Sequence, residues 1–185
     1  MIHCVSEHQA RKVLASLHER MAEVGLELHP DKTKIVYCKD SNRTKPYPHV
    51  NFTFLGFTFR PRKALSKHRR IFTSFLPGVS TDALKRLRQT VRGWKLNRQT
   101  HVTLAALATQ YNPIIQGWWN YYGAFYQTAM LQVYQHLDRA LERWARRKYK
   151  ALSGRKRGSV QWLRKLKDAE PQLFYHWREV GNMVG

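Results

Sequence analysis

The chain has 185 residues, with 33 Lys or Arg against 12 Asp or Glu and a formal net charge of +21. Its residues are 43% hydrophobic and 12% aromatic, which excludes global disorder, because this is enough to build a core. A folded chain with this charge repels itself unless anions neutralise it, so nucleic acid is the first candidate partner. The two cysteines, Cys4 and Cys38, form no close pair, which excludes a disulfide framework and a zinc knuckle.

No targeting or membrane segment is recognisable. The opening MIHCVSEHQARK lacks a basic region followed by an apolar run, so we expect no secretory signal. No continuous apolar run reaches the length of a membrane span. We therefore expect a cytoplasmic protein with reduced thiols and no membrane partner.

Residues 1–76 predict an α+β region. Ser6-x-x-Gln9 is a capping box, apolar residues follow at helical spacing, and Gly25 is placed to end the helix. Short extended runs over 26–29 and 34–38 flank Pro30-Asp31-Lys32-Thr33, which suggests a hairpin.

Two more extended runs follow in the same region. They cover residues 51–59 (NFTFLGFTF) and 71–76, and the basic segment 60–70 is predicted as the turn between them.

From Pro77 the hydrophobic period changes from 2 to 3.6, which predicts an all-α antiparallel helical bundle over residues 77–152. The expected helices are 82–96 with Thr81 as N-cap, 103–111, a third restarted by Asn112-Pro113, and 129–149. The segment 153–159 (SGRKRGS) is interpreted as a basic linker, followed by a short helix around Trp162. The chain thus divides into residues 1–76, 77–152 and 153–185.

Basic residues recur in ordered rows on the predicted helices. In the last long helix, four cations fall within about 60° of one another, opposite the apolar stripe. These four are Arg139, Arg143, Arg146 and Lys150. A second row consists of Lys85, Arg88, Arg92 and Lys95, and Arg60, Arg62, Lys63, Lys67, Arg69 and Arg70 crowd one segment. A solvated basic surface would explain one row, but three clusters with almost no acids favour contact with phosphates.

The aromatic run after Gly117 is predicted to be mostly core. Trp118, Trp119, Tyr122 and Tyr126 share the apolar stripe, whereas Tyr121 points away from it and is a candidate for contact with nucleotides.

No catalytic or metal-binding pattern is present. Asp82 is the single carboxylate between Ser41 and Leu137, so that stretch offers no converging pair for a two-metal site. The histidines show no metal-ligand spacing, so a solvated or satisfied side chain is the default for each. They are His3, His8, His18, His29, His49, His68, His101, His136 and His176.

The order of several motifs resembles a known family. HPDKT and FLGF, followed by the segments LAALATQYNPIIQGWWNYYGAF and LDRALERWARRKYK, are similar to group II intron reverse transcriptases. Residues 1–76 resemble the end of the polymerase palm, and the helical part resembles the thumb or maturase domain. The resemblance covers roughly residues 1 to 165.

The resemblance also implies what the chain lacks. In that family a YADD motif supplies the metal-binding aspartates, and a strand resembling MIHC follows it directly. The resemblance therefore implies a strand over residues 1–5. Met1 then resembles an internal methionine, and the fingers and the aspartates lie outside this sequence. We therefore expect no catalytic residue, no metal site and no polymerisation by this chain alone; Mg²⁺ is expected only in a complete reverse transcriptase.

Individual residues take their expected roles from the same resemblance. Lys32 of HPDKT resembles a lysine proposed to assist pyrophosphate departure, and here would be a basic contact. Phe54, Leu55, Gly56 and Phe57 resemble the primer-grip hairpin, although an ordinary buried strand with a bulge explains FLGF equally well.

Three functions remain open at this point. The first is an RNA-binding maturase portion that binds structured group II intron RNA, and with it an RNA/DNA primer-template, to assist splicing and retrohoming. The second is a subunit of a split RNA-directed DNA polymerase, whose partner would be a separate fingers and palm polypeptide. The third is a basic structural protein of the ribosomal type, which explains the charge but not the ordered motifs.

Overall fold

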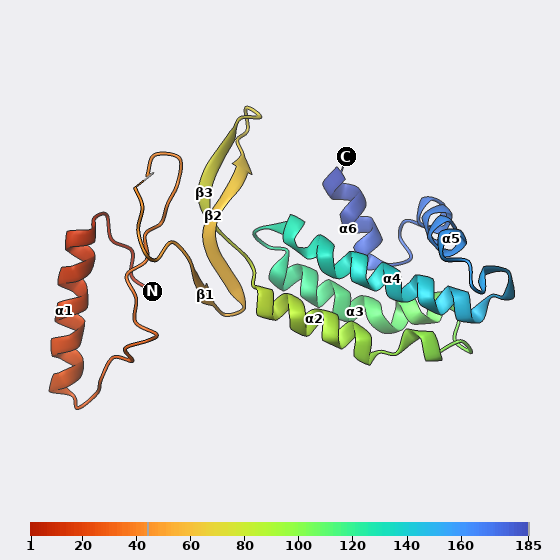
Figure 1. The fold of residues 1–185 in the computed structure, drawn as a ribbon, viewed down its shortest axis with the longest axis horizontal. Helices are drawn as coiled ribbons and strands as arrows, with labels where there is room; N and C mark the ends of the chain where they lie inside the picture. The colour runs from red at the N-terminus through yellow and green to blue at the C-terminus, as the bar shows by residue number, and fades with distance from the viewer. Residues whose placement is uncertain (44, 185) are drawn as a thin grey trace. The chain divides into compact units, whose positions relative to one another are not determined.

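A computed structural model describes residues 1–43 and 45–184 of the chain. With η marking a 3-10 helix, the elements in chain order are α1 (Glu7–Glu23), β1 (Phe52–Phe54), β2 (Phe57–Leu65), β3 (Ile71–Val79), α2 (Thr81–Gly93), η1 (Leu96–Arg98), α3 (Leu104–Tyr122), η2 (Gln127–Met130), α4 (Leu131–Lys148), η3 (Lys150–Leu152), α5 (Lys156–Ala169) and α6 (Tyr175–Val184) (Figure 1). They form two compact units, one from residues 1–52 and 60–75, the other from residues 53–59 and from 76 onward. None of the described helices is long and apolar enough to cross a membrane.

Helix α1 begins and ends at its sequence signals. The Ser6 hydroxyl accepts a hydrogen bond from the Gln9 N–H, and the Gln9 side chain accepts one from the backbone just before the cap. Gly25 has a left-handed φ of 70°, and the Leu26 N–H donates to the Met21 carbonyl at 2.8 Å. None of the α1 side chains is buried, so its apolar face is only partly covered.

The hairpin predicted after α1 is wrong. No described residue between α1 and β1 lies in a strand, and the same is true of residues 1–5. The Thr33 N–H donates to the His29 carbonyl at 3.0 Å, which makes a helical turn instead of a reversal. Tyr37 then pairs with a later part of the loop, donating its N–H to the His49 carbonyl and stacking on Tyr47 with ring centroids 4.1 Å apart. A short apolar run does not by itself determine whether a strand forms, because the stability of a strand depends on its packing against neighbouring strands.

The sheet is three-stranded, in the order β1-β2-β3. The run predicted as one strand over 51–59 is broken at Leu55 and Gly56, which have φ of 48° and 79°, as a two-residue type I′ hairpin requires. Strand β2 extends to Leu65, so the turn before β3 is shorter than the predicted 60–70. Pro61 is tolerated in β2 because β1 is only three residues long and leaves most of that edge of β2 unpaired.

Helix α2 begins at Thr81, one residue before the predicted start. Ser80, not Thr81, is the N-cap, and its hydroxyl accepts from the Ala83 N–H at 3.1 Å. Either hydroxyl could cap a helix, but the Ser80 N–H is held by the Gly56 carbonyl at 2.8 Å, which fixes Ser80 in the extended conformation of a cap. The helix ends at Gly93, before the predicted Leu96.

Helix α3 runs unbroken through the position where a restart was predicted. Pro113 lies inside it, and Asn112 is not a cap. Proline usually ends or kinks a helix, but the buried Tyr111 and Ile115 anchor the chain on both sides of it. The Asn112 side chain instead donates to the Leu173 carbonyl and accepts from the Tyr175 N–H, each at 2.9 Å, which fixes the start of α6.

One core joins α2, α3, α4, α5 and α6. The apolar stripe predicted for α4 is buried, including Val133, Leu137, Leu141 and Trp144. Between α2 and α3 the Trp94 ring stacks on Tyr111 and Trp118, with centroids 4.1 Å and 5.5 Å away.

The interpretation of residues 153–159 as a linker is wrong. Helix α5 starts inside this segment at Lys156, and Ser159 is fully buried. Leu163 of α5 and Phe174 and Trp177 near the C-terminus join the same core as α4. The glycines suggested a flexible connection, but Gly158 is accommodated within the helix, where contacts with α4 outweigh its low helix propensity.

Candidate nucleic-acid interface

The outer face of α2 is basic because its apolar residues face the core. Ala83, Leu84, Leu87 and Val91 are buried, and the cations occupy the opposite positions. Of the predicted row, Lys85 and Arg92 are exposed and Arg88 is half-buried. Lys95 lies beyond the end of α2, at a left-handed φ of 49°, and does not continue the row.

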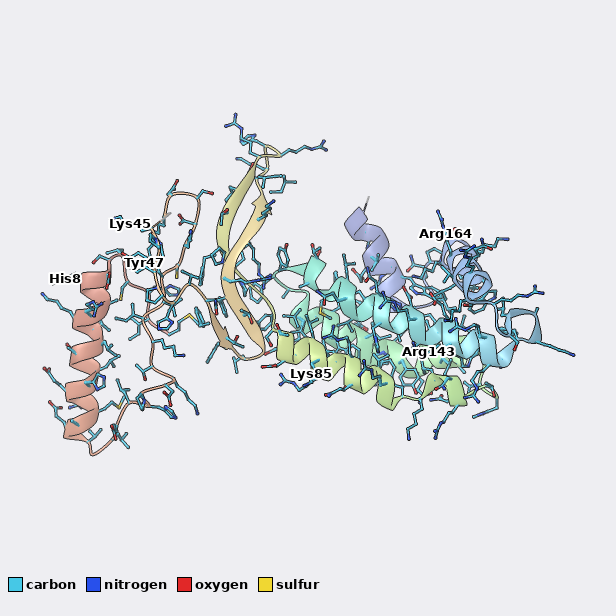
Figure 2. All side chains as sticks on the ribbon, in the orientation of Figure 1. His8, Lys45, Tyr47, Lys85, Arg143 and Arg164 are labelled. Atoms are coloured by element: carbon cyan, nitrogen blue, oxygen red, sulfur yellow. The ribbon has the colours of Figure 1, made fainter. Side chains whose placement is uncertain are left out.

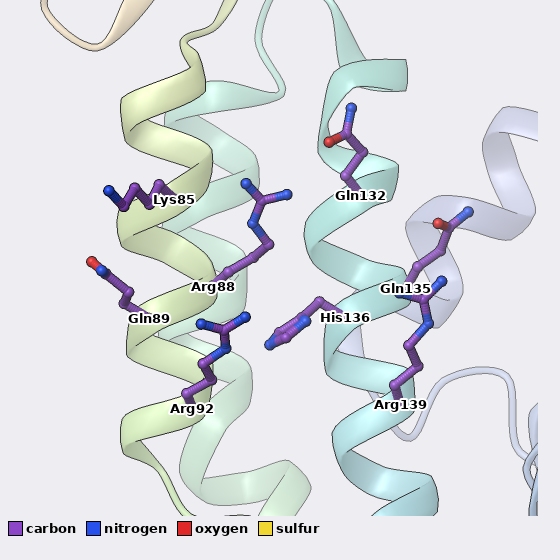
Figure 3. A pocket seen from close by; sticks show the side chains of 8 residues that line it. All are labelled: Lys85, Arg88, Gln89, Arg92, Gln132, Gln135, His136 and Arg139. Carbon is purple, nitrogen blue, oxygen red and sulfur yellow. The ribbon is translucent and has the colours of Figure 1, made fainter. Parts of the chain in front are cut away.

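A groove of about 400 Å³ lies between α2 and α4 (Figure 3). We call it the α2–α4 groove, and its lining residues are Lys85, Arg88, Gln89, Arg92, Gln132, Gln135, His136 and Arg139. No carboxylate is among them. The structure therefore brings together three cations of the row on α2 and one of the row on α4, at a site where an anion meets four positive charges and no carboxylate.

His136 is the functional candidate that the sequence analysis missed. Its ring extends from α4 toward α2, where Arg88 and Arg92 lie (Figure 3). Burial and the charges of Arg92, Arg143, Arg88 and Arg139 lower the pKa of His136, so the imidazole is neutral near neutral pH. Its position three residues before Arg139 and seven before Arg143 places it on their helix face, a signal that helical spacing carries.

A second groove lies between α4 and α5 and is also basic. This α4–α5 groove is lined by Arg139, Glu142, Arg143, Arg146, Lys156, Arg157 and Val160. Arg139 therefore belongs to both grooves. Burial and the neighbouring Asp138 raise the pKa of Glu142, which is the one carboxylate in this lining. Lys156 and Arg157 come from the segment interpreted as a linker, which is why the sequence analysis did not assign them to a site.

The cations of the row predicted on α4 differ in exposure and in hydrogen bonding. Arg143 is exposed, whereas Arg146 is half-buried and donates to the Ser159 hydroxyl at 2.6 Å, which ties α4 to α5. Lys150 is exposed in η3, past the end of α4, and does not line either groove. The helix ends before the fourth member of the row.

A largely buried carboxylate holds the C-terminal helices on α4. Asp138 accepts hydrogen bonds from Lys167 at 2.5 Å, from Trp177 at 3.0 Å and from His176 at 3.1 Å. Burial would raise the pKa of Asp138, but the hydrogen bonds from His176 and Lys167 and the Lys167 charge outweigh it and lower the pKa to about 2. Burial lowers the pKa of His176, so that ring is neutral and its Nε2–H donates. This network is structural and lies outside the lining of both grooves.

The aromatic residues divide largely as expected. Trp118, Trp119 and Tyr122 are half-buried against the core, and Tyr121 is 48% exposed. Tyr121 is not free of structural contacts, because its hydroxyl donates to the Leu55 carbonyl at 2.8 Å.

The FLGF turn packs against α3. Phe57 is buried among Tyr121, Tyr122 and Phe125, whereas Phe54 and Leu55 are exposed. A Cβ on Gly56 would lie 3.2 Å from the Tyr122 hydroxyl oxygen, so the space beside this glycine is filled by the protein's own ring. Of the two interpretations of FLGF, a strand with a bulge is wrong, because Leu55 and Gly56 form a hairpin turn, whereas contact with a primer stays a prediction.

The remaining predicted contacts lie in the other unit. Lys32, Arg60, Lys63, Lys67, Arg69 and Arg70 are exposed there. Arg62 is buried, with 9% of its surface exposed, so it is not an outward-facing cation of β2.

Among the described residues, no group of three or more His, Cys, Asp or Glu side chains is arranged to hold a metal ion. The two cysteines are unpaired and half-buried, and burial raises the pKa of the Cys38 thiol.

Comparison with known families identifies the helical part of the chain. Residues 84–162 match the group II intron, maturase-specific domain. No curated protein and no solved structure matches the chain. The matched range contains most of α2, all of α3 and α4 and the first half of α5, and with them both basic grooves. The helical bundle from residue 84 to residue 162 therefore belongs to the group II intron maturase-specific domain family.

Proposed function

We propose that this chain binds group II intron RNA through the two basic grooves of its helical bundle and helps the intron fold for splicing and retrohoming. The observation that carries the proposal is the α2–α4 groove, where four cations from two helices converge and no carboxylate is present. Phosphates supply most of the affinity of proteins for nucleic acids, and such a groove meets a phosphate backbone without an acidic neighbour.

The protein would act in splicing by binding and not by bond chemistry. A folded intron brings phosphates close together, and cations on a rigid bundle reduce the repulsion between them. The positions of these cations are fixed because each basic helix face lies opposite a buried apolar face.

The test is a salt-dependent binding titration with a group II intron RNA. Replacing Arg88 and Arg92 by Gln removes two cations of the α2–α4 groove, so the affinity should fall. The slope of log affinity against log salt should flatten by roughly 0.7 to 0.9 for each phosphate that the variant no longer neutralises.

The matched control carries Arg164→Gln and Lys165→Gln. This pair removes the same charge from exposed positions of α5 that line neither groove (Figure 2 labels Arg164). Equal decreases of affinity and slope in the two variants would show that net charge alone governs binding, which would refute the proposed interface.

A second candidate function is a subunit of a split reverse transcriptase. The first unit favours it, because α1 buries none of its side chains and Met1, Ile2, Val5 and Leu26 are exposed, as expected for a surface that a separate fingers and palm chain would cover. Residues 1–76 would then be the end of the palm and the bundle the thumb. Co-purification with such a chain and primer extension by the mixture, but by neither chain alone, would establish this function.

A further inference from the structure

We propose that the α2–α4 groove is a phosphate site in which His136 contacts RNA as an imidazolium, so that RNA binding takes up a proton. This inference rests on the proposed binding of RNA. It adds a contact residue, and it makes affinity depend on pH in a way that the arginines alone cannot produce, because they stay charged at every physiological pH.

The position of His136 is the first observation. The side chain lies on α4 between the groove's cations, with Arg88 and Arg92 on α2 facing it and Arg139 and Arg143 on its own helix (Figure 3 labels all but Arg143). Lys85 lines the same groove from α2. The charged groups that surround the ring from both helices are therefore all cations.

The hydrogen bonding of the ring is the second observation. The Nε2 atom of His136 is buried and has no hydrogen-bond partner in the described part of the protein. A buried polar atom without a partner costs free energy, so such an atom in a native site calls for an explanation. A phosphate oxygen in the groove would supply the missing partner.

The sign of the proton coupling follows from the charges. In the free protein, burial and four neighbouring arginines lower the pKa of His136 and keep the ring neutral. A bound phosphate replaces this repulsion by attraction and accepts a hydrogen bond from the charged ring, so the pKa rises. At a pH between the two values, binding takes up a proton, and the affinity falls as the pH rises through that interval.

The neutral free state also explains why a histidine suits this place better than a fifth permanent cation. Like charges this close destabilise the free bundle, and a neutral ring adds nothing to that repulsion. The additional charge forms only when RNA is present to neutralise it.

The experiment measures proton uptake and affinity with one RNA hairpin from a group II intron. Calorimetric titrations in two buffers of different ionisation enthalpy give the protons taken up, and filter binding between about pH 5.5 and 8.5, a range that spans the ordinary histidine pKa, gives the slope of log affinity against pH. We expect His136→Gln to lose up to one unit of that slope and the corresponding proton uptake. His101→Gln, at an exposed histidine outside the groove, should keep both.

A measurement on the unmodified protein makes the answer independent of how well the variant folds. The NMR signal of the His136 Cε1–H should titrate at a higher pH in the RNA complex than in the free protein. RNA binding with an unchanged His136 titration, or with equal pH slopes in H136Q and the unmodified protein, would overturn this inference and leave the proposed function standing. Failure to bind the RNA at any pH would overturn both.

Discussion

Two adjacent residues of α4 have opposite roles. Asp138 is a largely buried anion that holds α5 and α6 on the bundle, and Arg139 is an exposed cation shared by the two grooves. Adjacent positions on a helix point about 100° apart, so one helix can contribute both to the core and to the proposed RNA-binding surface. The side of α4 on which a charged residue lies thus decides whether it stabilises the fold or faces the grooves.

Replacing Asp138 by Asn should destabilise the protein strongly. The variant leaves the part-buried Lys167 without its counter-ion and weakens the bonds from His176 and Trp177, and the loss of hydrogen bonds to a charged group typically costs about 1.5–3 kcal/mol. Urea unfolding should show this destabilisation as a lower midpoint with an unchanged slope. Asp168→Asn, at an exposed position of α5, is the control. Similar midpoints for the two variants would mean that the Asp138 network contributes little.

At the scale of elements, the ends of a helix are predictable where one local signal marks them. They are not predictable where two neighbouring residues offer the same signal. The capping box at Ser6 and the terminating Gly25 were predictable, because both act within a few residues of chain. Thr81 and Ser80 offer equivalent hydroxyls, and the choice between them depends on Gly56, which is distant in sequence.

The continuous α3 was not predictable from the sequence either. Asn112-Pro113 is a valid helix start, and only the packing of Tyr111 and Ile115 overrides it.

Two hydrogen bonds between α3 and the start of α6 come from one side chain, Asn112. Asn112→Ala removes both hydrogen bonds that hold Leu173 and Tyr175, so amide exchange over α6 should become faster while exchange in α2 stays unchanged. Asn120→Ala, at an exposed position of the same helix, should leave α6 protected. Unaltered α6 exchange in N112A would show that the apolar contacts of Phe174 and Trp177 suffice.

Candidate contact residues were predictable only where a helix pattern repeats them. The basic rows are visible in the sequence, but their convergence in the α2–α4 groove depends on which faces of α2 and α4 meet, and no local pattern states that. For this reason helical spacing can place His136 on the helix face of Arg139 and Arg143, but it cannot show that the ring meets the cations of α2. Lys156 and Arg157 were missed for the related reason that glycine-bounded RKR resembles a linker until its packing against α4 is known.

At the scale of the whole molecule, burial is concentrated in the second unit. The core cluster extends from Val79 to Trp177, whereas α1 contributes no buried side chain. Apolar burial is the main source of stability, so the two units should differ in resistance to local unfolding.

Limited trypsin digestion should therefore remove the first unit before the bundle is cut. We expect a resistant fragment that begins between residues 64 and 71, because trypsin cuts after Lys and Arg and the exposed Lys63, Lys67, Arg69 and Arg70 are its accessible sites there. Mass spectrometry of the digest identifies its ends. Survival of residues 1–52 for as long as the bundle, in monomeric protein, would show that the first unit is a stable domain in its own right.

The positions of the tryptophans allow the unfolding of one unit to be followed by fluorescence. All six tryptophans, including the stacked Trp94 and Trp118, lie between residues 94 and 177, within the second unit. Fluorescence excited selectively at tryptophan, so that Tyr37 and Tyr47 of the first unit do not contribute, therefore reports the second unit alone, whereas far-ultraviolet circular dichroism also records α1. If the two units melt separately, the two signals will have different midpoints on heating, and the gap between the curves measures how independently the units unfold.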